Sequence, residues 1–193
     1  PLGPTHLAID DIGLMRSLPN MTIIHPSDAE EMARAIKASE HWNGPIYIRL
    51  CRGGETVTSK EDLGYEIGKD IELRKPKDLV ILANGTMVFR ALEVAEKLEA
   101  DGITAGVLNV HTVKPLDQEK VRDYILNIPN IMTVEEHNKT GGLGSAVAEM
   151  IADEPGNVKP SFKRMGFPDC YPDKYGQQDI MIKHYGLNVN NIY

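Results

Sequence analysis

"DLVILANGTMVFRALEVAEKLEADGITAGVLNV" occupies residues 78–110 and decides the fold class. It begins with an apolar run, 78–85, that predicts a fully buried strand. Residues 86–102 repeat apolar side chains at helical spacing and end at Gly102, a residue type that commonly terminates helices. The apolar run 103–110 predicts a second strand. A strand, a helix and a strand at this spacing indicate a parallel crossover unit.

The same alternation extends to both sides of this segment. Downstream, the pattern predicts a helix, a strand and a further helix that follows a glycine-rich turn, at 117–128, 130–137 and 141–154. Upstream, it predicts a strand, a helix and a strand at 21–26, 28–41 and 44–50. The fold class is therefore α/β, with a parallel βαβ unit followed by a separate, mostly parallel, three-layer α/β domain.

Domain boundaries follow from a change in composition. The polar, glycine-punctuated stretch 56–77 predicts a linker with one hairpin. It separates an N-terminal portion, 1–55, from a C-terminal domain, 78–193, whose tail is rich in Gly, Pro and Tyr and less regular.

Composition excludes several classes of function. The 193 residues are 41% hydrophobic and 25% charged, which is typical of a globular protein. A net charge of −7 argues against nucleic acid or an anionic membrane as the main partner. No apolar run approaches the ~20 residues of a membrane span, and the sequence starts without a signal-peptide pattern. Two cysteines without metal-ligand spacing indicate free thiols, so we expect a cytoplasmic protein.

His6 lies in a loop directly before a predicted helix, for which Thr5 is the expected N-cap. A histidine at a helix start can donate a hydrogen bond to a hydroxyl or phosphate group. The spacing alone favours the alternative, in which this histidine bonds to its own backbone.

Arg49 and Arg52 bracket Cys51 at the end of a predicted parallel strand, and two glycines follow. An arginine in this place can reach a phosphate, and a surface ion pair fits the pattern equally well. Cys51 has no histidine at a recognisable spacing, so we interpret it as a structural thiol rather than a nucleophile.

The glycine-rich stretch "GGLGSA", residues 141–146, departs from the dinucleotide-binding pattern, because Val147 stands where the third glycine belongs. We interpret the stretch as a tight turn with close helix packing. Glu135, Glu136 and His137 precede it and fit either a site or the rim of a subunit contact.

Together these motifs resemble one known family. "GPTHLAIDDIGLMRSLPNMTIIHPSDAEEM", residues 3–32, resembles the later part of the pyrimidine-binding domain of transketolases. "RLCRG", residues 49–53, is similar to the strand-end arginine motif of that family. "VKPLD" and "TVEEHNKTGGLGSAVAE", residues 113–117 and 133–149, resemble its C-terminal domain. The 1-deoxy-D-xylulose-5-phosphate synthases share much of this layout, and the beta subunits of 2-oxoacid dehydrogenases share it more distantly.

The resemblance implies an enzyme of carbohydrate metabolism, as in the pentose phosphate pathway, that moves a two-carbon ketol unit between sugar phosphates. His6 matches the family's catalytic histidine near the substrate hydroxyls and the reacting carbon. Arg52 matches the arginine that binds the sugar phosphate. In the complete enzyme the resemblance implies thiamine diphosphate and Mg²⁺ as cofactors and a homodimer as the assembly.

The sequence also departs from the family. Leu2 stands where an Asp contacts a substrate hydroxyl, and Leu7 stands where Gln is common. The sequence has no counterpart to the family's diphosphate-binding segment, its metal ligands or its activating glutamate. We therefore expect that this chain alone binds neither cofactor nor metal, is inactive, and needs an N-terminal segment or subunit. The alternatives are a non-catalytic role in dimerisation or regulation, or the equivalent portion of one of the two related enzymes.

Overall fold

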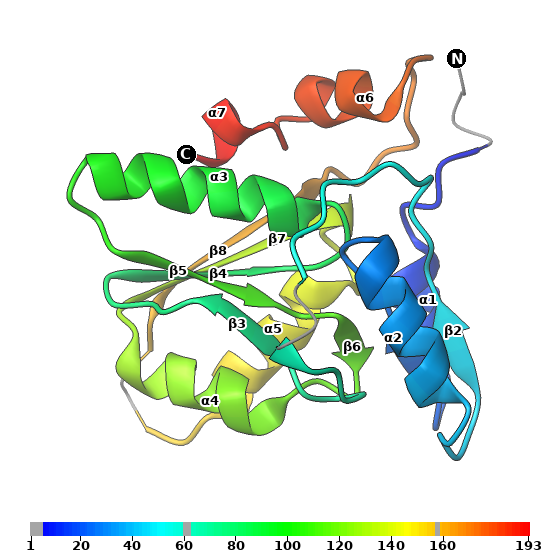
Figure 1. Ribbon diagram of the computed structural model, residues 1–193. Coiled ribbons are helices and arrows are strands. Elements are labelled where there is room, and N and C mark those ends of the chain that lie inside the picture. Colours follow the sequence, from blue (N-terminus) through cyan, green and yellow to red (C-terminus); the bar gives the residue numbers. More distant parts are fainter. Residues whose placement is uncertain (1–5, 60–62, 157–158) are drawn as a thin grey trace.

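The computed structural model describes residues 6–59, 63–156 and 159–193, whose strands form two sheets (Figure 1). The larger sheet has five strands in the order β3-β5-β4-β7-β8. These strands are β3 (Ile71–Arg74), β4 (Leu79–Ala83), β5 (Ala105–Asn109), β7 (Asn130–Asn138) and β8 (Ser161–Phe167). Every neighbouring pair is parallel except the edge pair β3–β5. The predicted mostly parallel sheet is therefore confirmed.

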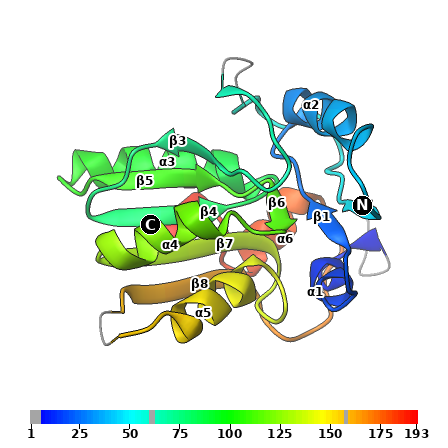
Figure 2. The same cartoon turned by 90° about the horizontal axis from the view of Figure 1, so that it is seen from below.

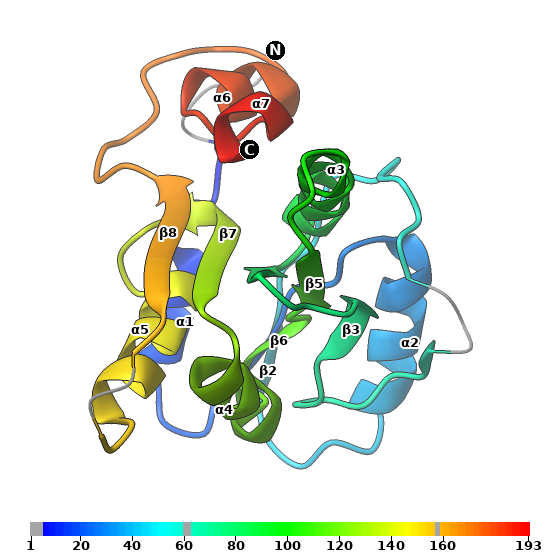
Figure 3. The same ribbon diagram turned by 90° about the vertical axis from the view of Figure 1, so that its left-hand side faces the viewer.

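Helices cover both faces of this sheet and complete three layers (Figures 1 and 3). One face carries α3 (Met87–Ala100), α6 (Gln178–His184) and α7 (Val189–Ile192). The other face carries α4 (Gln118–Asn127) and α5 (Leu143–Asp153). A separate apolar core lies on each side of the sheet, so β4 and β5 are buried on both faces.

Helix α3 forms where the sequence predicts it. It buries Met87, Ala91 and Val94 along one stripe against the sheet. It ends in a turn in which the Ile103 amide donates to the Leu98 carbonyl at 2.9 Å. This turn requires a positive φ, +82° at Gly102, which glycine adopts without strain.

A second sheet, in the order β2-β1-β6, joins the two predicted units (Figure 2). Its strands are β1 (Thr22–Ile24), β2 (Ile46–Ile48) and β6 (Thr112–Lys114), and α1 (Asp11–Arg16) and α2 (Ala29–Ser39) accompany it. Strands β1 and β2 are parallel and α2 connects them, which confirms the predicted crossover. Strand β6 follows β5 closely and pairs antiparallel with β1. The two units therefore share backbone hydrogen bonds.

Several elements differ from the sequence-based expectation. The first helix begins at Asp11 rather than directly after Thr5, which lies outside the described residues. Part of the predicted linker forms β3, and the less regular tail contains β8, α6 and α7. The boundaries at 55 and 77 stay predictions. Within the described ranges, no helix is long and apolar enough to cross a membrane.

Candidate functional site

An open pocket of about 530 Å³ lies where β1, β2 and β7 end. Its lining includes the polar side chains of His6, His25, Arg49, Cys51, Arg52, Glu136 and Gln178. The two predicted site residues, His6 and Arg52, therefore line one cavity, although 46 positions separate them in the sequence. Ligands of crossover folds commonly bind outside the carboxyl ends of parallel strands, which is where this pocket lies.

The two arginines that follow β2 have different environments. Arg49 donates to the backbone carbonyl of Ala8 and lies 3.5 Å from the Asp11 carboxylate, to which Tyr47 also donates. Through these contacts Arg49 holds the backbone segment that follows His6 in the sequence. Arg52 is exposed at the pocket and forms no hydrogen bond or ion pair with another described residue. Its guanidinium group is therefore available to an anionic ligand.

Cys51 lies between the arginines, with its Sγ 3.8 Å from Nε2 of His25. Burial raises the pKa of Cys51 to about 12, and the nearby Glu136 and Glu55 carboxylates add to the rise. The thiol is therefore protonated at neutral pH and is a poor nucleophile.

His25, to which the sequence pattern assigns no role, lies next to Cys51 in the structure. His25 follows β1 and Cys51 follows the neighbouring parallel strand β2. The predicted pairing of these two strands is therefore the sequence signal that could place the two residues side by side. Burial and the Arg49 charge hold the pKa of His25 well below its usual value, so the ring is neutral. The ring packs on Gly85, where a β-carbon would overlap it.

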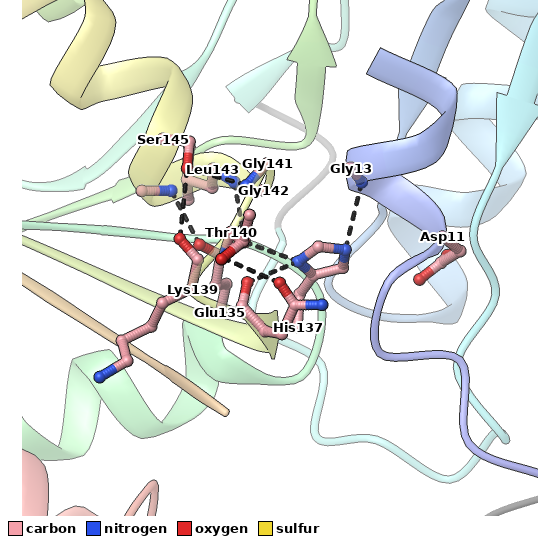
Figure 4. A network of polar contacts seen from close by, with 12 residues as sticks. Asp11, Gly13, Glu135, His137, Lys139, Thr140, Gly141, Gly142, Leu143 and Ser145 are labelled. Carbon is pink, nitrogen blue, oxygen red and sulfur yellow. Dashed lines mark hydrogen bonds and ion pairs between the residues drawn. The ribbon is translucent and has the colours of Figure 1, made fainter. Parts of the chain in front are cut away.

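The glycine-rich turn between β7 and α5 packs closely against the side chains of Glu135 and His137 (Figure 4). Glu135 accepts hydrogen bonds from the amides of Leu143 and Gly144, at 2.7 and 2.8 Å, and so caps α5. A β-carbon at Gly142 would overlap the Glu135 carboxylate. These contacts agree with the interpretation as a tight turn, because the side chain of Glu135 uses amides that a nucleotide phosphate would need.

His137 connects this turn to the N-terminal unit (Figure 4). The Gly13 amide donates to its Nε2 at 3.2 Å, so the ring proton lies on Nδ1, which is 2.7 Å from the Asn138 carbonyl. Burial lowers the pKa of His137, which keeps this neutral form. Of the three residues that could form a site or a rim, Glu135 and His137 are therefore buried within the chain. Glu136 points to the other face of β7 and lines the pocket.

Among residues 6–59, 63–156 and 159–193, no group of three or more His, Cys, Asp or Glu side chains could hold a metal ion. These residues therefore do not fit the role of a metal site.

The fold and the pocket define a two-unit α/β protein with an open pocket lined by residues of both units. Residues 2–54 match the transketolase pyrimidine-binding domain, and residues 68–192 match the transketolase C-terminal domain. The chain belongs to the transketolase family, as the sequence motifs indicate.

Its relatives include proteins with different substrates. The 6-deoxy-6-sulfo-D-fructose transketolase subunit SqwH of Clostridium sp. (strain MSTE9) is 37% identical over 190 residues, which are 98% of this chain and 58% of SqwH. A 1-deoxy-D-xylulose-5-phosphate synthase of Heliobacterium modesticaldum is 38% identical over 192 residues, 98% of this chain and 29% of that enzyme. A solved split-gene transketolase, described as an inactive beta4 tetramer, matches with a TM-score of 0.90 and 36% identity, covering 98% of this chain and 61% of that one. This chain thus spans 61% or less of each relative's length.

Proposed function

We propose that this chain is the C-terminal part of a transketolase that transfers a two-carbon ketol unit between sugar phosphates. The observation that carries the proposal is the placement of His6 and Arg52 in one pocket of a transketolase-family fold. Arg52 binds the substrate phosphate, because its exposed guanidinium can donate two parallel hydrogen bonds to phosphate oxygens. His6 contacts the substrate hydroxyls near the reacting carbon. Anchoring the phosphate fixes the position of the reacting end.

The cofactors of the complete enzyme are thiamine diphosphate and Mg²⁺. Thiamine diphosphate stabilises the carbanion that such a transfer requires. Because the described residues do not fit a metal site, we assign the binding of Mg²⁺ and the diphosphate to a further segment or a partner subunit. The split-gene transketolase that matches this chain supports an arrangement in which separate chains share the enzyme. A homodimer of the completed enzyme and a cytoplasmic location remain parts of this proposal.

The direct test is an activity assay of the complete enzyme, or of this chain with its partner subunit. We expect transfer from a ketose phosphate to an aldose phosphate that depends on both thiamine diphosphate and Mg²⁺. Absence of transfer from a range of ketose phosphates, in a preparation that binds the cofactor, would contradict the proposal.

A second candidate is 1-deoxy-D-xylulose-5-phosphate synthesis, which is favoured by the 38% identity to that enzyme over 98% of this chain. This reaction also condenses a short carbon unit with a phosphorylated aldehyde, so Arg52 keeps its role. Carbon dioxide release from pyruvate separates the two candidates, because ketol transfer between sugar phosphates releases none.

A further inference from the structure

Glu136 brings a carboxylate from the C-terminal unit into the pocket that His6 and Arg52 line from the N-terminal unit. It lies near the end of β7, where strand alternation turns it away from Glu135 and His137. It is half-buried, and its charge is close enough to Cys51 to contribute to the raised pKa of that thiol. The cavity thus holds a cationic and an anionic side chain from different units.

Two neutral side chains hold the Glu136 carboxylate in place. Its Oε2 accepts hydrogen bonds from the Thr86 hydroxyl at 2.8 Å and from the Gln178 side-chain amide at 2.6 Å. No described residue donates to the second oxygen, Oε1. The donors carry no charge, so they fix the carboxylate without neutralising it. This arrangement leaves Oε1 of Glu136 as an oriented hydrogen-bond acceptor for a ligand.

The C-terminal tail supplies one of these donors and part of the pocket wall. Gln178 is the first residue of α6, and both Gln178 and Gly176 line the pocket. A second contact holds the same helix, because Arg90 of α3 lies 2.6 Å from the Asp179 carboxylate. The Asp179 side chain is 84% exposed, so this ion pair contributes little to stability.

We propose that Glu136 is a specificity-determining residue that accepts a hydrogen bond from a hydroxyl group of the sugar phosphate. This inference rests on the proposed function of the pocket. A carboxylate repels a phosphate group, so the phosphate binds at Arg52 and the hydroxylated carbons face Glu136. A carboxylate that pairs with a substrate hydroxyl favours that substrate over an analogue that lacks the hydroxyl, because the analogue cannot form this charge-assisted hydrogen bond.

A structural role makes a different prediction. If Glu136 only fastened α6 to β7, its replacement would weaken the use of every substrate equally. The test therefore compares substrates that differ by one hydroxyl group.

The experiment measures kcat/KM of the complete enzyme for ribose 5-phosphate and for its 2-deoxy and 3-deoxy analogues. We expect Glu136→Gln to lower kcat/KM for ribose 5-phosphate about 10- to 100-fold, as the loss of a hydrogen bond to a charged group does. For one of the two deoxy analogues, the same change should lower kcat/KM less than about twofold, because the contact is already missing. An equal loss for all three substrates would overturn the inference.

Two further variants keep the result interpretable. Asp179→Asn removes the neighbouring contact of α6 and should leave the ratio of the three kcat/KM values unchanged. Glu136→Asp retains the charge with a shorter side chain, and it provides the test if Glu136→Gln fails to fold. A loss of hydroxyl preference in Asp179→Asn as large as in the Glu136 variants would contradict the proposal.

Binding of the same three ligands, measured by calorimetry, separates this inference from the proposed function. A wild-type enzyme that prefers ribose 5-phosphate but transfers no ketol unit contradicts the proposed function alone. A preference that survives in Glu136→Gln contradicts the inference alone. A wild type that binds none of the three ligands contradicts both.

Discussion

The glycine-rich turn and the pocket both lie at strand ends, and both contain histidine and glutamate, but the two regions use these residues differently. In the turn, Glu135 and His137 are buried, and their polar atoms bond to backbone groups of the same chain. In the pocket, His6 and Arg52 are exposed around an open cavity. Buried polar groups that bond within the chain indicate a structural role, whereas exposed polar groups around a cavity can contact a ligand.

The turn also shows how α1 is held against the C-terminal unit. Arg16 donates to the Gly141 carbonyl at 2.7 Å and pairs with Glu149 at 2.6 Å. A β-carbon at Gly141 would lie 2.9 Å from the Cα of Gly13, so the two backbones are in direct contact. The motif that resembles a nucleotide-binding loop therefore binds another part of its own chain.

The largest expected effect is on stability, at the turn. Gly142→Ala places a methyl group on the Glu135 carboxylate and beside the His137 ring. We expect the free energy of unfolding to fall by about 3 kcal/mol, measured by denaturant titration. Gly176→Ala is the matched control, since the atoms nearest to its methyl group belong to the Ile180 side chain, at 3.2 Å, and no overlap arises. Equal losses in the two variants would refute the tight packing of the turn.

The next effect is on catalysis, at the pocket. Arg52→Ala should lower kcat/KM of the complete enzyme for a phosphorylated aldehyde about 100-fold, because a charge-assisted pair is lost. Turnover of glycolaldehyde, which has no phosphate, should change little. Arg74 of the edge strand β3 pairs with Glu99 of α3 and is not among the described residues that line the pocket, so Arg74→Ala serves as the control. A similar loss of kcat/KM for both aldehydes would show that Arg52 does not bind the phosphate group.

His6→Ala should have a smaller catalytic effect. We expect kcat to fall about 10-fold while the KM for the phosphorylated substrate changes little, because the contact is with the reacting end. The exposed His41, which follows α2, offers the control substitution His41→Ala. If KM rises and kcat is unchanged, His6 contributes to binding rather than to the reaction.

Measured per pH unit, the smallest expected effect is the pH dependence of stability that comes from the turn. Burial raises the pKa of Glu135 to about 7, and its backbone hydrogen bonds only partly oppose the rise. The folded state therefore binds more protons than the unfolded state between about pH 4.5 and 7. The contribution of Glu135 to stability is complete below that window and is lost as the pH rises through it.

Glu135→Gln should flatten this dependence, since an amide does not titrate. Thermal melting of the complete protein from pH 4.5 to 8 measures the difference in slope, which is no more than about 1.4 kcal/mol per pH unit. Identical pH profiles for the variant and the wild type would show that Glu135 ionises normally.

The sequence predicts the central fold because β4 and β5 are continuous buried runs and α3 has a regular apolar stripe. It does not predict β6, because three residues are too few to show a period. Strand β8 is also missed, since it is an edge strand in which Lys163 and Arg164 interrupt the apolar pattern.

The candidate site is less predictable than the fold. Spacing alone favoured a structural role for His6 and left Arg52 undecided, and only the family resemblance selected them. Glu136 could not be separated from Glu135 and His137, because that choice depends on which face of β7 covers a core. Gln178 lies in the tail, and its hydrogen-bond partner Glu136 is 42 positions away in the sequence. Tertiary contacts of this kind leave no local pattern in a sequence.

The most direct test of the account is a crystal structure of the complete enzyme with ribose 5-phosphate. The account predicts that the phosphate group lies within hydrogen-bond distance of the Arg52 guanidinium and that His6 contacts the same ligand. A sugar phosphate bound elsewhere, with this pocket closed by another part of the enzyme, would contradict it.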